Sequence, residues 1–543
     1  MDELNGVVHG ALYEALYDVA IVGLGPCGAV AAALLGQAGL RVLVLDKSHS
    51  VYDKPRAVAM DHEIMRVLQG IGVADAVLPH TEPFSASEHF GADGQLIRRL
   101  TMLPPPYPMG WTPSMVFRQP PVEQILRDRV AALPSVDVRL GVELVALEQD
   151  GEGVSLQLQS QDGSVRPARA AYVIGCDGAS STVRRLVGIE LEDLDFDEPW
   201  LVVDVLANAR GLAKLPKASA QFCEPTRPIS FLIGTDNHRR WEIMLLPGED
   251  AQAMAQEAEV WKLLARWITP DDGELWRRAS YRFHALVAKD WHKGCVFIAG
   301  DAAHQQPPFL GQGMCQGVRD VSNLAWKLQQ AIAGKAGNAA EALLDTYGQE
   351  RGAHVRQLTA TIKGIGRYIC ERDPVAARER DARLIAEAGG TVKSQPRQDL
   401  IPGLKVGLLS GLDHPCASAH PAQPAPTAPP PHPAVGTLFP QPRVLQNGQP
   451  VLLDDAAGSG WRIVLGDAAL GWSPTAGTGY ALLRVATTPQ PGAWTETEGV
   501  LAGWFQRHTC AAAIVRPDHY VYAVAATAHA LQAELAALAV KLP

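Results

Sequence analysis

The chain has 543 residues, of which 47% are hydrophobic and 20% charged, so its composition is that of an ordinary globular protein too long for one compact core, and two or three domains are expected. Its formal net charge of -10 leaves no basic surface that would attract a phosphate backbone, which argues against nucleic acid as a partner. Its eight cysteines are scattered, with no two at Cys-x-x-Cys spacing, which argues against a zinc cage or a thioredoxin-type redox pair and leaves the reducing cytoplasm as the expected location.

The N-terminal part of the chain predicts a strand–helix–strand unit. Residues 1–16 form an extension that carries acidic residues and no basic region before an apolar run, so no secretory signal is expected. Residues 17–22 and 41–45 are short β-rich runs on either side of an Ala-rich helix that begins near Gly28. They open the predicted first part, residues 17–190, of a Rossmann-like α/β domain.

A glycine-rich motif, Gly23-Leu24-Gly25-Pro26-Cys27-Gly28, joins the first strand to the helix. Gly23 permits a tight turn, Gly25 lets the backbone approach a pyrophosphate, and Gly28 lets helix and strand pack closely, while the helix N-terminus offers free N–H groups to phosphates. Asp46, at the end of the next strand, can accept hydrogen bonds from ribose hydroxyls. A glycine-rich turn alone is a weak signal, but with strand, helix and acid in place the pattern predicts a dinucleotide site.

A second motif follows another apolar strand. Residues 172–184 run as a strand into Asp177 and Gly178 and end on a basic residue, Arg184. The pattern then changes between residues 191 and 290, where short strands at 201–205, 229–233 and 241–246 are separated by turn-rich segments. This predicts an inserted antiparallel sheet, the wall of a substrate pocket.

A third motif begins after the apolar strand at residues 295–299. Gly300-Asp301-Ala302-Ala303-His304 continues through Pro307-Pro308-Phe309-Leu310-Gly311-Gln312-Gly313-Met314 into a helix from about Gly317 to Ala333. Asp301 ends a strand, where an acid can accept hydrogen bonds from ligand hydroxyls, although it could equally cap the following helix. Residues 291–413 are therefore predicted to return to the first domain.

The remaining chain divides into a linker and a further domain. Residues 414–434 are dominated by Pro and Ala, which excludes helix or central strand. Residues 435–543 then have the length of a normal domain. Its last segment, residues 521–542, is rich in Ala and Leu but is interrupted by polar residues, and Leu531, Leu535 and Leu538 recur at helical spacing, which predicts a packing face rather than a membrane span.

The three motifs, in this order, resemble those of the single-component flavin aromatic hydroxylases over about residues 19–351. The resemblance implies a bound FAD, a reduced nicotinamide (NADH or NADPH) and O2 as co-substrates, and a phenolic small molecule as substrate. Two further segments fit it: Lys54-Pro55-Arg56-Ala57 is similar to a loop whose arginine lies beside the cofactor, and Arg118-Gln119 with Glu123 is similar to a helix start whose glutamine contacts FAD. The alternatives for these two are a surface loop and a solvated helix face.

Carried onto this sequence residue by residue, the resemblance implies one set of FAD-binding positions. Gly311 and Gly313 would let backbone N–H groups lie against the flavin ring. The implied positions are Gly23, Gly25, Pro26, Gly28, Asp46, Lys47, Arg56, Arg118, Gln119, Asp177, Gly178, Gly300, Asp301, Pro308, Gly311, Gly313 and Met314.

Over nearly the whole chain, the sequence is most similar to the 3-(3-hydroxyphenyl)propionate hydroxylases, which implies hydroxylation of that acid to its 2,3-dihydroxy product. Residues 439–444 and 515–521 resemble the thioredoxin-like domain that such hydroxylases append. Because that segment lacks a Cys pair, a structural role or an association surface, as in a homodimer, is expected of it. The chain departs from the broader family at Cys315, where asparagine is common, and at His62, where an acid is frequent.

The chemistry requires a base or proton relay near the phenol, because the phenolate carbons are more nucleophilic, and it requires exclusion of water. His304, beside the third motif, is the candidate catalytic residue, with a packed loop histidine as the alternative. Tyr281, His284 and His238 are weaker candidates.

Three other functions compete with a hydroxylase. A flavin disulfide reductase or dehydrogenase would need a Cys pair and a second strand–GxGxxG–helix, and neither is visible. A flavin halogenase would need a Trp-x-Trp-x-Ile segment, which is absent. A non-catalytic flavoprotein would oxidise no NADH with any phenol.

Overall fold

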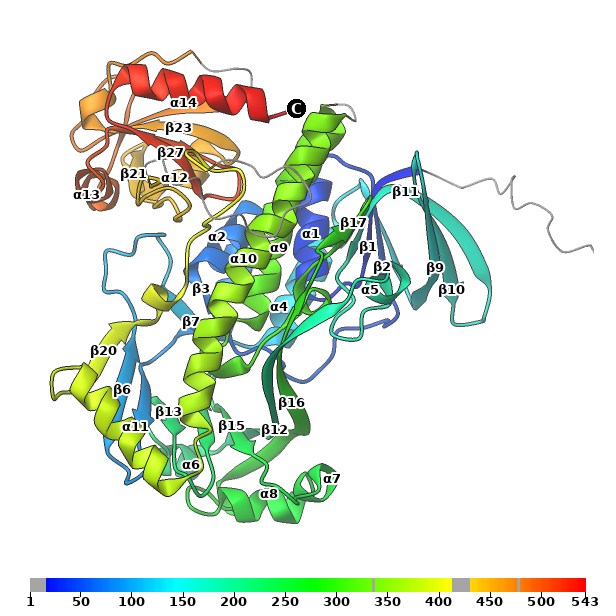
Figure 1. Cartoon of the computed structure of the whole chain (residues 1–543), viewed down its shortest axis with the longest axis vertical. Helices are drawn as coiled ribbons and strands as arrows, with labels where there is room; N and C mark the ends of the chain where they lie inside the picture. The colour runs from blue at the N-terminus through cyan, green and yellow to red at the C-terminus, as the bar shows by residue number, and fades with distance from the viewer. Residues whose placement is uncertain (1–15, 335–336, 413–429, 476–478) are drawn as a thin grey trace, which may run out of the picture.

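The structure, a computed structural model, describes residues 16–334, 337–412, 430–475 and 479–543. Nearly all of the predicted N-terminal extension and most of the predicted Pro-rich linker lie outside the described residues. The chain forms two large sheets, a smaller C-terminal unit and a long helix, α10, that runs from beside the C-terminal unit to the second sheet (Figure 1).

The first sheet carries the motif-bearing strands. Its order is β17-β18-β11-β1-β2-β8, and the β9–β10 hairpin extends it beside β11. β1, β2, β8, β11 and β18 pair in parallel, and the last four residues of β1 and the first four of β2 are buried, as parallel strands between helix layers require. The strands are β1 Leu16–Val22, β2 Val42–Asp46, β8 Val136–Leu140, β9 Val142–Asp150, β10 Gly153–Ser160, β11 Val165–Gly175, β17 His292–Lys293 and β18 Val296–Ile298. The helices of this part are α1 Pro26–Gln37, α2 His62–Gly70, α3 Ala74–Val77, α4 Gln119–Ala131, α5 Thr182–Leu186, α9 Gly313–Ala333 and α10 Asn338–Ile369.

The second sheet has the order β19-β16-β12-β15-β14-β13-β5-β6-β20 and is mostly antiparallel, as predicted for this region. Two long strands, β12 and β16, join it to the first sheet. Their length differs from the short strands predicted, because each bends through bulges instead of ending at a turn. The elements are β5 Ser87–Phe90, β6 Leu96–Thr101, β12 Leu191–Ala207, β13 Ser219–Phe222, β14 Ile229–Ile233, β15 His238–Met244, β16 Gly273–Ala288, β19 His304–Gln305, β20 Lys393–Pro396, α6 Ala209–Lys214, α7 Ala251–Met254, α8 Glu257–Leu264 and α11 Pro374–Glu387. A small third sheet joins β3 Ala59–Asp61, β4 Thr81–Pro83 and β7 Ser114–Phe117.

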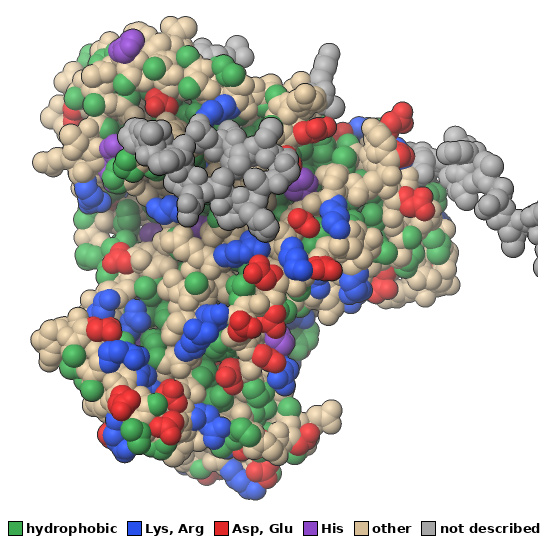
Figure 2. Space-filling view, in the orientation of Figure 1, with side chains coloured by type: hydrophobic (Ala, Val, Ile, Leu, Met, Phe, Trp, Pro, Cys, Tyr) green, Lys and Arg blue, Asp and Glu red, His purple; other side chains and the backbone are tan. Residues whose placement is uncertain are grey.

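The two faces of the second sheet differ in chemistry. One face, with Val203, Trp241 and Phe231, is apolar and packs with residues of α8. The other face packs Trp200 and Val202 against the loop after β19. Along β15 the residues alternate between the two faces, so that Arg240 and Glu242 lie on the face opposite Trp241 and Ile243. On the face seen in Figure 2, acidic and basic side chains are intermixed over the lower part of the molecule.

The C-terminal unit is a five-stranded mixed sheet, ordered β25-β24-β23-β26-β27, with α13 and α14, and it agrees with the thioredoxin-like prediction. Leu531, Leu535 and Leu538 are the buried residues of α14, so the predicted packing face is confirmed. None of the described helices combines the length and the apolarity needed to cross a membrane. The elements are β21 Arg443–Gln446, β22 Gln449–Leu452, α12 Leu453–Ala457, β23 Trp461–Leu465, β24 Tyr480–Ala486, β25 Trp494–Thr495, α13 Val500–Arg507, β26 Ala512–Val515, β27 Val521–Ala525 and α14 Ala528–Lys541.

Buried ion pairs hold the C-terminal unit against the rest of the chain. Arg66 of α2 pairs with Asp454 at 2.7 Å and also donates to the Phe439 carbonyl. Arg516 pairs with Glu350 of α10 at 2.7 Å, and both side chains are fully buried. This extent of burial indicates a docked unit rather than one tethered only by its linker.

Candidate functional site

The glycine motif at the end of β1 forms an open cradle at the start of α1. A Cβ at Gly28 would lie 1.9 Å from the Gly23 carbonyl oxygen, and Gly23 itself has a φ of +101°, so the backbone requires glycine at both positions. Gly25, by contrast, has no atom of the described residues within 4 Å of an added Cβ. The first turn of α1 carries no acidic side chain, and no side chain caps its N–H groups. These features fit a bound pyrophosphate.

Asp46 is held in place by the same motif. Its carboxylate accepts hydrogen bonds from the backbone N–H groups of Leu24 and Ser48, both at 2.7 Å, and Arg127 lies 3.8 Å away. Because an ionised carboxylate has about four lone-pair sites, two remain for a ligand. The geometry therefore fits a ribose partner, whereas the neighbouring Lys47 is exposed.

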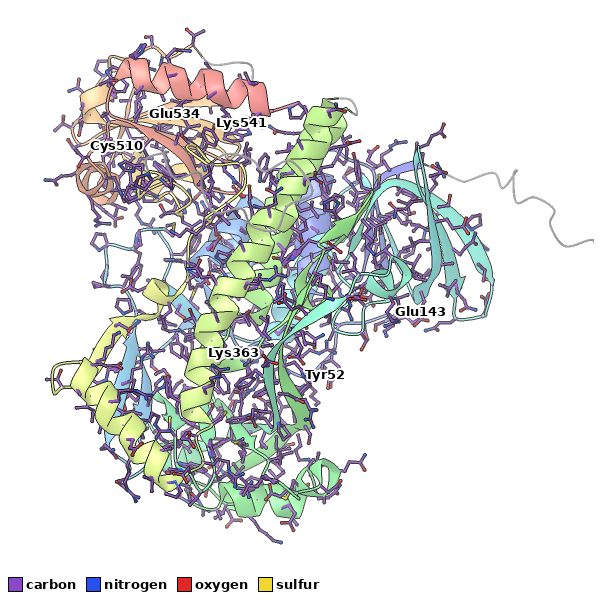
Figure 3. All side chains as sticks on the ribbon, viewed as in Figure 1. Tyr52, Glu143, Lys363, Cys510, Glu534 and Lys541 are labelled. Atoms are coloured by element: carbon purple, nitrogen blue, oxygen red, sulfur yellow. The ribbon has the colours of Figure 1, made fainter. Side chains whose placement is uncertain are left out.

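The loop at residues 54–57 is fixed from two sides. Gln119 accepts from the Ala57 N–H at 2.8 Å, so its side chain supports the loop. Arg240 of β15 donates to the Arg56 carbonyl at 2.7 Å and to the Pro55 carbonyl at 3.2 Å. The guanidinium of Arg56 lies over the Tyr52 ring, which Figure 3 labels beside the second sheet. Of the predicted residues nearby, Arg118 pairs with an exposed acid at 2.5 Å on the surface.

Asp204 of β12 is the buried anchor behind this loop. It accepts two hydrogen bonds from Arg240, at 2.7 and 3.1 Å, and lies 2.7 Å from His238 Nε2. Burial alone would raise the pKa of this carboxyl, but the Arg240 and His238 partners lower it. His238, a weaker catalytic candidate, is thereby committed to an ion-pair network.

The second and third motifs are bonded to each other. The Asp177 carboxylate caps α5, accepting from Ser181 Oγ at 2.5 Å and from the Thr182 N–H at 2.6 Å. Arg184 donates to the Ala302 carbonyl at 2.8 Å. The two turns therefore form one edge of the first sheet, with Gly178 at a φ of +80°.

Asp301 differs from Asp177 because its carboxylate has no hydrogen-bond or ion-pair partner among the described residues. It is exposed, yet the protein around it desolvates the carboxyl and raises its pKa. An acceptor left without a protein partner beside a sheet edge is available to ligand hydroxyls. This arrangement fits the ribityl chain of FAD.

His304 belongs to a buried network under the same turn. Its Nε2 lies 2.7 Å from Asp320, which also accepts from the Gly300 N–H at 2.9 Å and from Arg351 at 2.8 Å. His304 is 1% exposed, and its Nδ1 has no partner among the described residues. The other weaker candidates, Tyr281 and His284, lie on β16.

The loop at residues 308–313 leads from β19 of the second sheet into α9. Gly311 adopts the left-handed conformation with a φ of +59°. Arg397 donates to the Leu310 carbonyl at 2.6 Å, and Gln312 bonds to Arg319 and Asp61. Pro308, Gly313 and Met314 flank this turn, and Gly313 begins α9.

Sequence reasoning missed several residues of this region, namely Asp204, Arg240, Glu242, Asp320 and Arg397. Only one signal could have found some of them: charged residues at 240 and 242 alternate with Trp241 and Ile243, which indicates a strand with one polar face. The pairing of Asp320 with His304 has no sequence signal.

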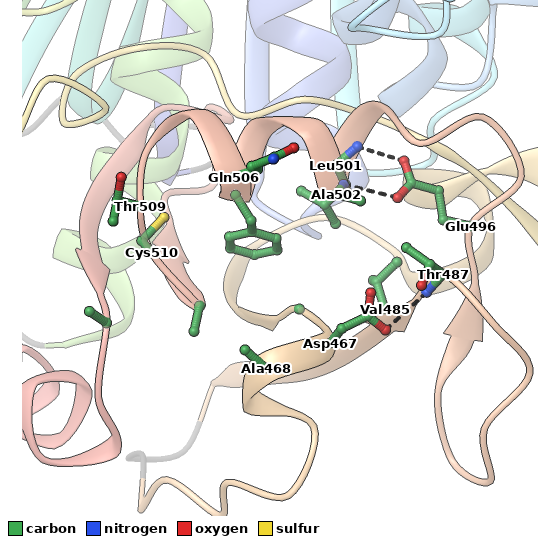
Figure 4. Close-up of a pocket in the computed structure, with 14 residues that line it drawn as sticks. Asp467, Ala468, Val485, Thr487, Glu496, Leu501, Ala502, Gln506, Thr509 and Cys510 are labelled. Atoms are coloured by element: carbon green, nitrogen blue, oxygen red, sulfur yellow. Dashed lines mark hydrogen bonds between the residues drawn. The ribbon is translucent and has the colours of Figure 1, made fainter.

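A cavity of about 470 Å³ lies in the C-terminal unit, between α13 and its sheet (Figure 4). Its acids are used within the unit: Glu496 accepts from the Leu501 and Ala502 N–H groups, and Asp467 accepts from the Thr487 N–H at 3.1 Å. The cavity therefore has a structural explanation and lies apart from the motifs.

The chain is similar in sequence to known protein families and to individual proteins. A family model described as an FAD binding domain matches residues 16–361, and one described as an HcaD C-terminal domain matches residues 436–541. The chain is 37% identical to a probable NADH-specific resorcinol 4-hydroxylase of Rhodococcus jostii (strain RHA1), over 97% of this chain and 94% of that protein. It is 33% identical to a 3-(3-hydroxy-phenyl)propionate/3-hydroxycinnamic acid hydroxylase of Mycobacterium sp. (strain KMS), over 93% and 87%.

Among solved structures, the flavin-dependent monooxygenase PieE in complex with FAD and substrate is similar, with a TM-score of 0.76 at 22% identity over 97% of this chain and 99% of that one. A ternary complex of aklavinone-11 hydroxylase with FAD and aklavinone has a TM-score of 0.74 at 23% identity, with the same coverage. These two likenesses support the fold.

Proposed function

The chain belongs to the FAD-dependent aromatic hydroxylases, which use FAD and a reduced nicotinamide, and from that premise we propose that it hydroxylates a small meta-substituted phenol. The first candidate is 3-(3-hydroxyphenyl)propionate, converted to its 2,3-dihydroxy product. The proposal rests on one observation. The loop at residues 54–57 is bonded to Arg240 of the second sheet, and the loop at residues 308–313 is bonded to Arg397 beside that sheet.

Each part of the predicted FAD site has a distinct task in this proposal. When bound, FAD takes electrons from the nicotinamide and supplies activated oxygen to the ring. The open N-terminus of α1 receives the phosphates, Asp46 accepts from the ribose, and Asp301 accepts from the ribityl hydroxyls. Arg240 and Asp204 hold the 54–57 loop against the second sheet, which helps to exclude water.

A carboxylated substrate is supported by two cations, Arg397 at the 308–313 loop and Arg98 on β6, which both lie near the buried His89. Arg397 is 9% exposed, lies over the Phe84 ring at 4.3 Å and forms no ion pair among the described residues. Burial lowers its pKa to about 10. Arg98 of β6 also lacks an ion-pair partner among the residues that the structure describes, and its Nε is buried. A ligand carboxylate would compensate charges that are costly to bury alone.

Resorcinol is the second candidate, and one observation favours it. The relative at 37% identity is named a resorcinol 4-hydroxylase, and the relative named for the phenylpropionate is 33% identical. Resorcinol carries a second hydroxyl in place of the acid, so it would leave Arg397 uncompensated. The same relative is named NADH-specific, which supports NADH as the reductant.

The described cysteines are free, which supports a reducing cytoplasm.

For His304, the hydrogen-bond pattern supports a positioning role. Through Asp320 it holds the Gly300 N–H and hence the turn that presents Asp301. Its direct participation in proton transfer stays a prediction, as does a homodimer.

NADH oxidation by the FAD-loaded enzyme is expected to be strongly stimulated by a phenol with a meta carboxylated side chain, more than by resorcinol, because substrate gates flavin reduction in enzymes without a nicotinamide domain. The product should be a catechol with one oxygen atom from labelled O2. Peroxide release is measured in parallel across a panel of phenols. Label in water or peroxide but never in a ring would overturn the hydroxylase proposal, and a preference for resorcinol would select the second candidate.

Asp301→Ala is expected to weaken FAD binding, because it removes a charge-assisted acceptor worth about 1.5–3 kcal/mol. The dissociation constant is measured by titrating apoprotein with FAD and following flavin fluorescence. Asp290→Ala, which removes an exposed carboxyl from the same part of the chain, is the matched control. FAD affinity equal to wild type in the Asp301 variant would show that this motif does not hold the cofactor.

A further inference from the structure

One buried acid on the second sheet, Glu242, has no partner in the part of the chain that the structure describes. Glu242 of β15 is 5% exposed, and among the described residues its carboxyl forms no hydrogen bond and no ion pair. Buried polar groups are almost always paired, so an unpaired carboxyl is unusual enough to need a reason. A ligand that donates a hydrogen bond would supply one.

Strand register places Glu242 on the face of the second sheet that meets the loops at residues 54–57 and 308–313. It is two residues from Arg240, so both side chains lie on the same side of β15, and Arg240 reaches the 54–57 loop. Its cross-strand partner Val202 and the next residue on that face, Met244, pack in one cluster with Phe309 and Leu310. Glu242 therefore lies between the two loops that the proposed function assigns to the flavin.

The neighbours of Glu242 leave it as an acceptor. Its partner on β14 is Ser230, whose hydroxyl donates to Gln221 at 2.5 Å instead. The charged groups that act on it are Arg240 on its own strand and Asp204 on β12. Farther away are Arg277 on β16, which lies opposite Asp204, and Arg397 behind the Leu310 carbonyl.

We propose, as an extension of the function proposed above, that Glu242 is the catalytic residue that accepts the phenol proton of the substrate. The O–H bond of the phenol breaks, the proton moves to a Glu242 carboxylate oxygen, and the electron pair stays on the phenol oxygen. The resulting phenolate has more nucleophilic ortho and para carbons. After the ring is hydroxylated, the proton returns from Glu242 to the product oxygen.

Burial supports this role because it makes the Glu242 carboxylate a stronger base. It raises the pKa of Glu242 to about 7, with Arg240 opposing and Asp204 adding to the rise. A base works best when its pKa lies near the operating pH, because it is then both deprotonated and strong. The active carboxylate form is gained as the pH rises through this value, so the rate of hydroxylation should increase in the same range.

The test measures kcat/KM for a phenol with the FAD-loaded enzyme as a function of pH. In the wild type, kcat/KM should rise with pH and level off above about 7, and in Glu242→Gln it should rise only as the pH approaches the ordinary phenol pKa of about 10. At pH 8, kcat should fall at least about tenfold in the variant, with the FAD dissociation constant unchanged. Glu198→Gln, which removes a half-buried carboxyl of β12, is the matched control and should behave as wild type.

An unchanged pH profile of kcat/KM in Glu242→Gln would overturn the inference. Should that variant lose FAD, a second measurement on the wild type decides: the methyl ether of the same phenol has no proton to donate, so its affinity should fall as the pH rises through about 7, while the phenol keeps its affinity. The same pH dependence for both ligands would overturn the inference. A wild type that incorporates no oxygen into any phenol would instead refute the proposed function, so the two failures are distinguishable.

Discussion

Replacing Asp454 by asparagine is expected to lower the free energy of unfolding by about 3–5 kcal/mol. Asp454 is the shared counterion of Arg66 and Arg462, whose side chains are 0% and 1% exposed, at 2.7 and 2.5 Å. Without its charge, two guanidinium groups would remain buried side by side, with His519 next to them. The loss should be seen by denaturant unfolding of the FAD-loaded protein.

The difference in stability between the wild type and Asp454→Asn should depend on pH. Burial alone would raise the pKa of Asp454, but Arg66 and Arg462 lower it well below its ordinary value. The stabilisation is therefore present above about pH 4 and is lost as the pH falls further, so the gap between wild type and variant should narrow in acid. Asp455→Asn, at the exposed next residue, is the control and should change stability by at most about 0.5 kcal/mol. Equal losses for the two variants would contradict this account of the interface.

Valine at Gly25 is expected to give a folded protein that purifies without FAD, whereas alanine at Gly28 should damage the fold itself. Among the residues that the structure describes, no atom lies within 4 Å of an added Cβ at Gly25, and the φ of -74° there suits any residue. The side chain would therefore occupy only the space of the pyrophosphate. At Gly28 the Cβ would lie 1.9 Å from a backbone oxygen, which cannot move aside.

The two substitutions act as controls for each other. FAD content is read from the visible spectrum and folding from circular dichroism. Losing two or more phosphate hydrogen bonds, each worth about 1.5–3 kcal/mol, should weaken FAD binding by Gly25→Val more than about 100-fold. A yellow Gly25→Val protein would place the pyrophosphate elsewhere, and a stable Gly28→Ala protein would refute the close approach of α1 and β1.

The sequence predicts most reliably what local geometry encodes. The spacing of Gly23, Gly25 and Gly28 is a property of one strand and one helix, and the leucines of α14 follow the period of a single helix, so both could be read without tertiary information. Asp204 with Arg240, and Asp320 with Arg351, are pairs separated by more than 30 residues, and only the paired elements bring them together. The same limit applies to Glu242, because a missing partner becomes visible only when every neighbour is known.

The docking of the C-terminal unit limits which C-terminal units could be exchanged between relatives. Its buried partners on the rest of the chain lie on separate helices, Arg66 on α2, Asn323 on α9 and Glu350 on α10. A chimera joined in the linker would bring foreign residues against these three polar side chains and against Trp326, which packs on Trp461. Such a chimera should assemble only if the grafted unit supplies the counterparts of Asp454, Arg516 and Trp461, so the exchangeable module is the unit together with its three helical contacts.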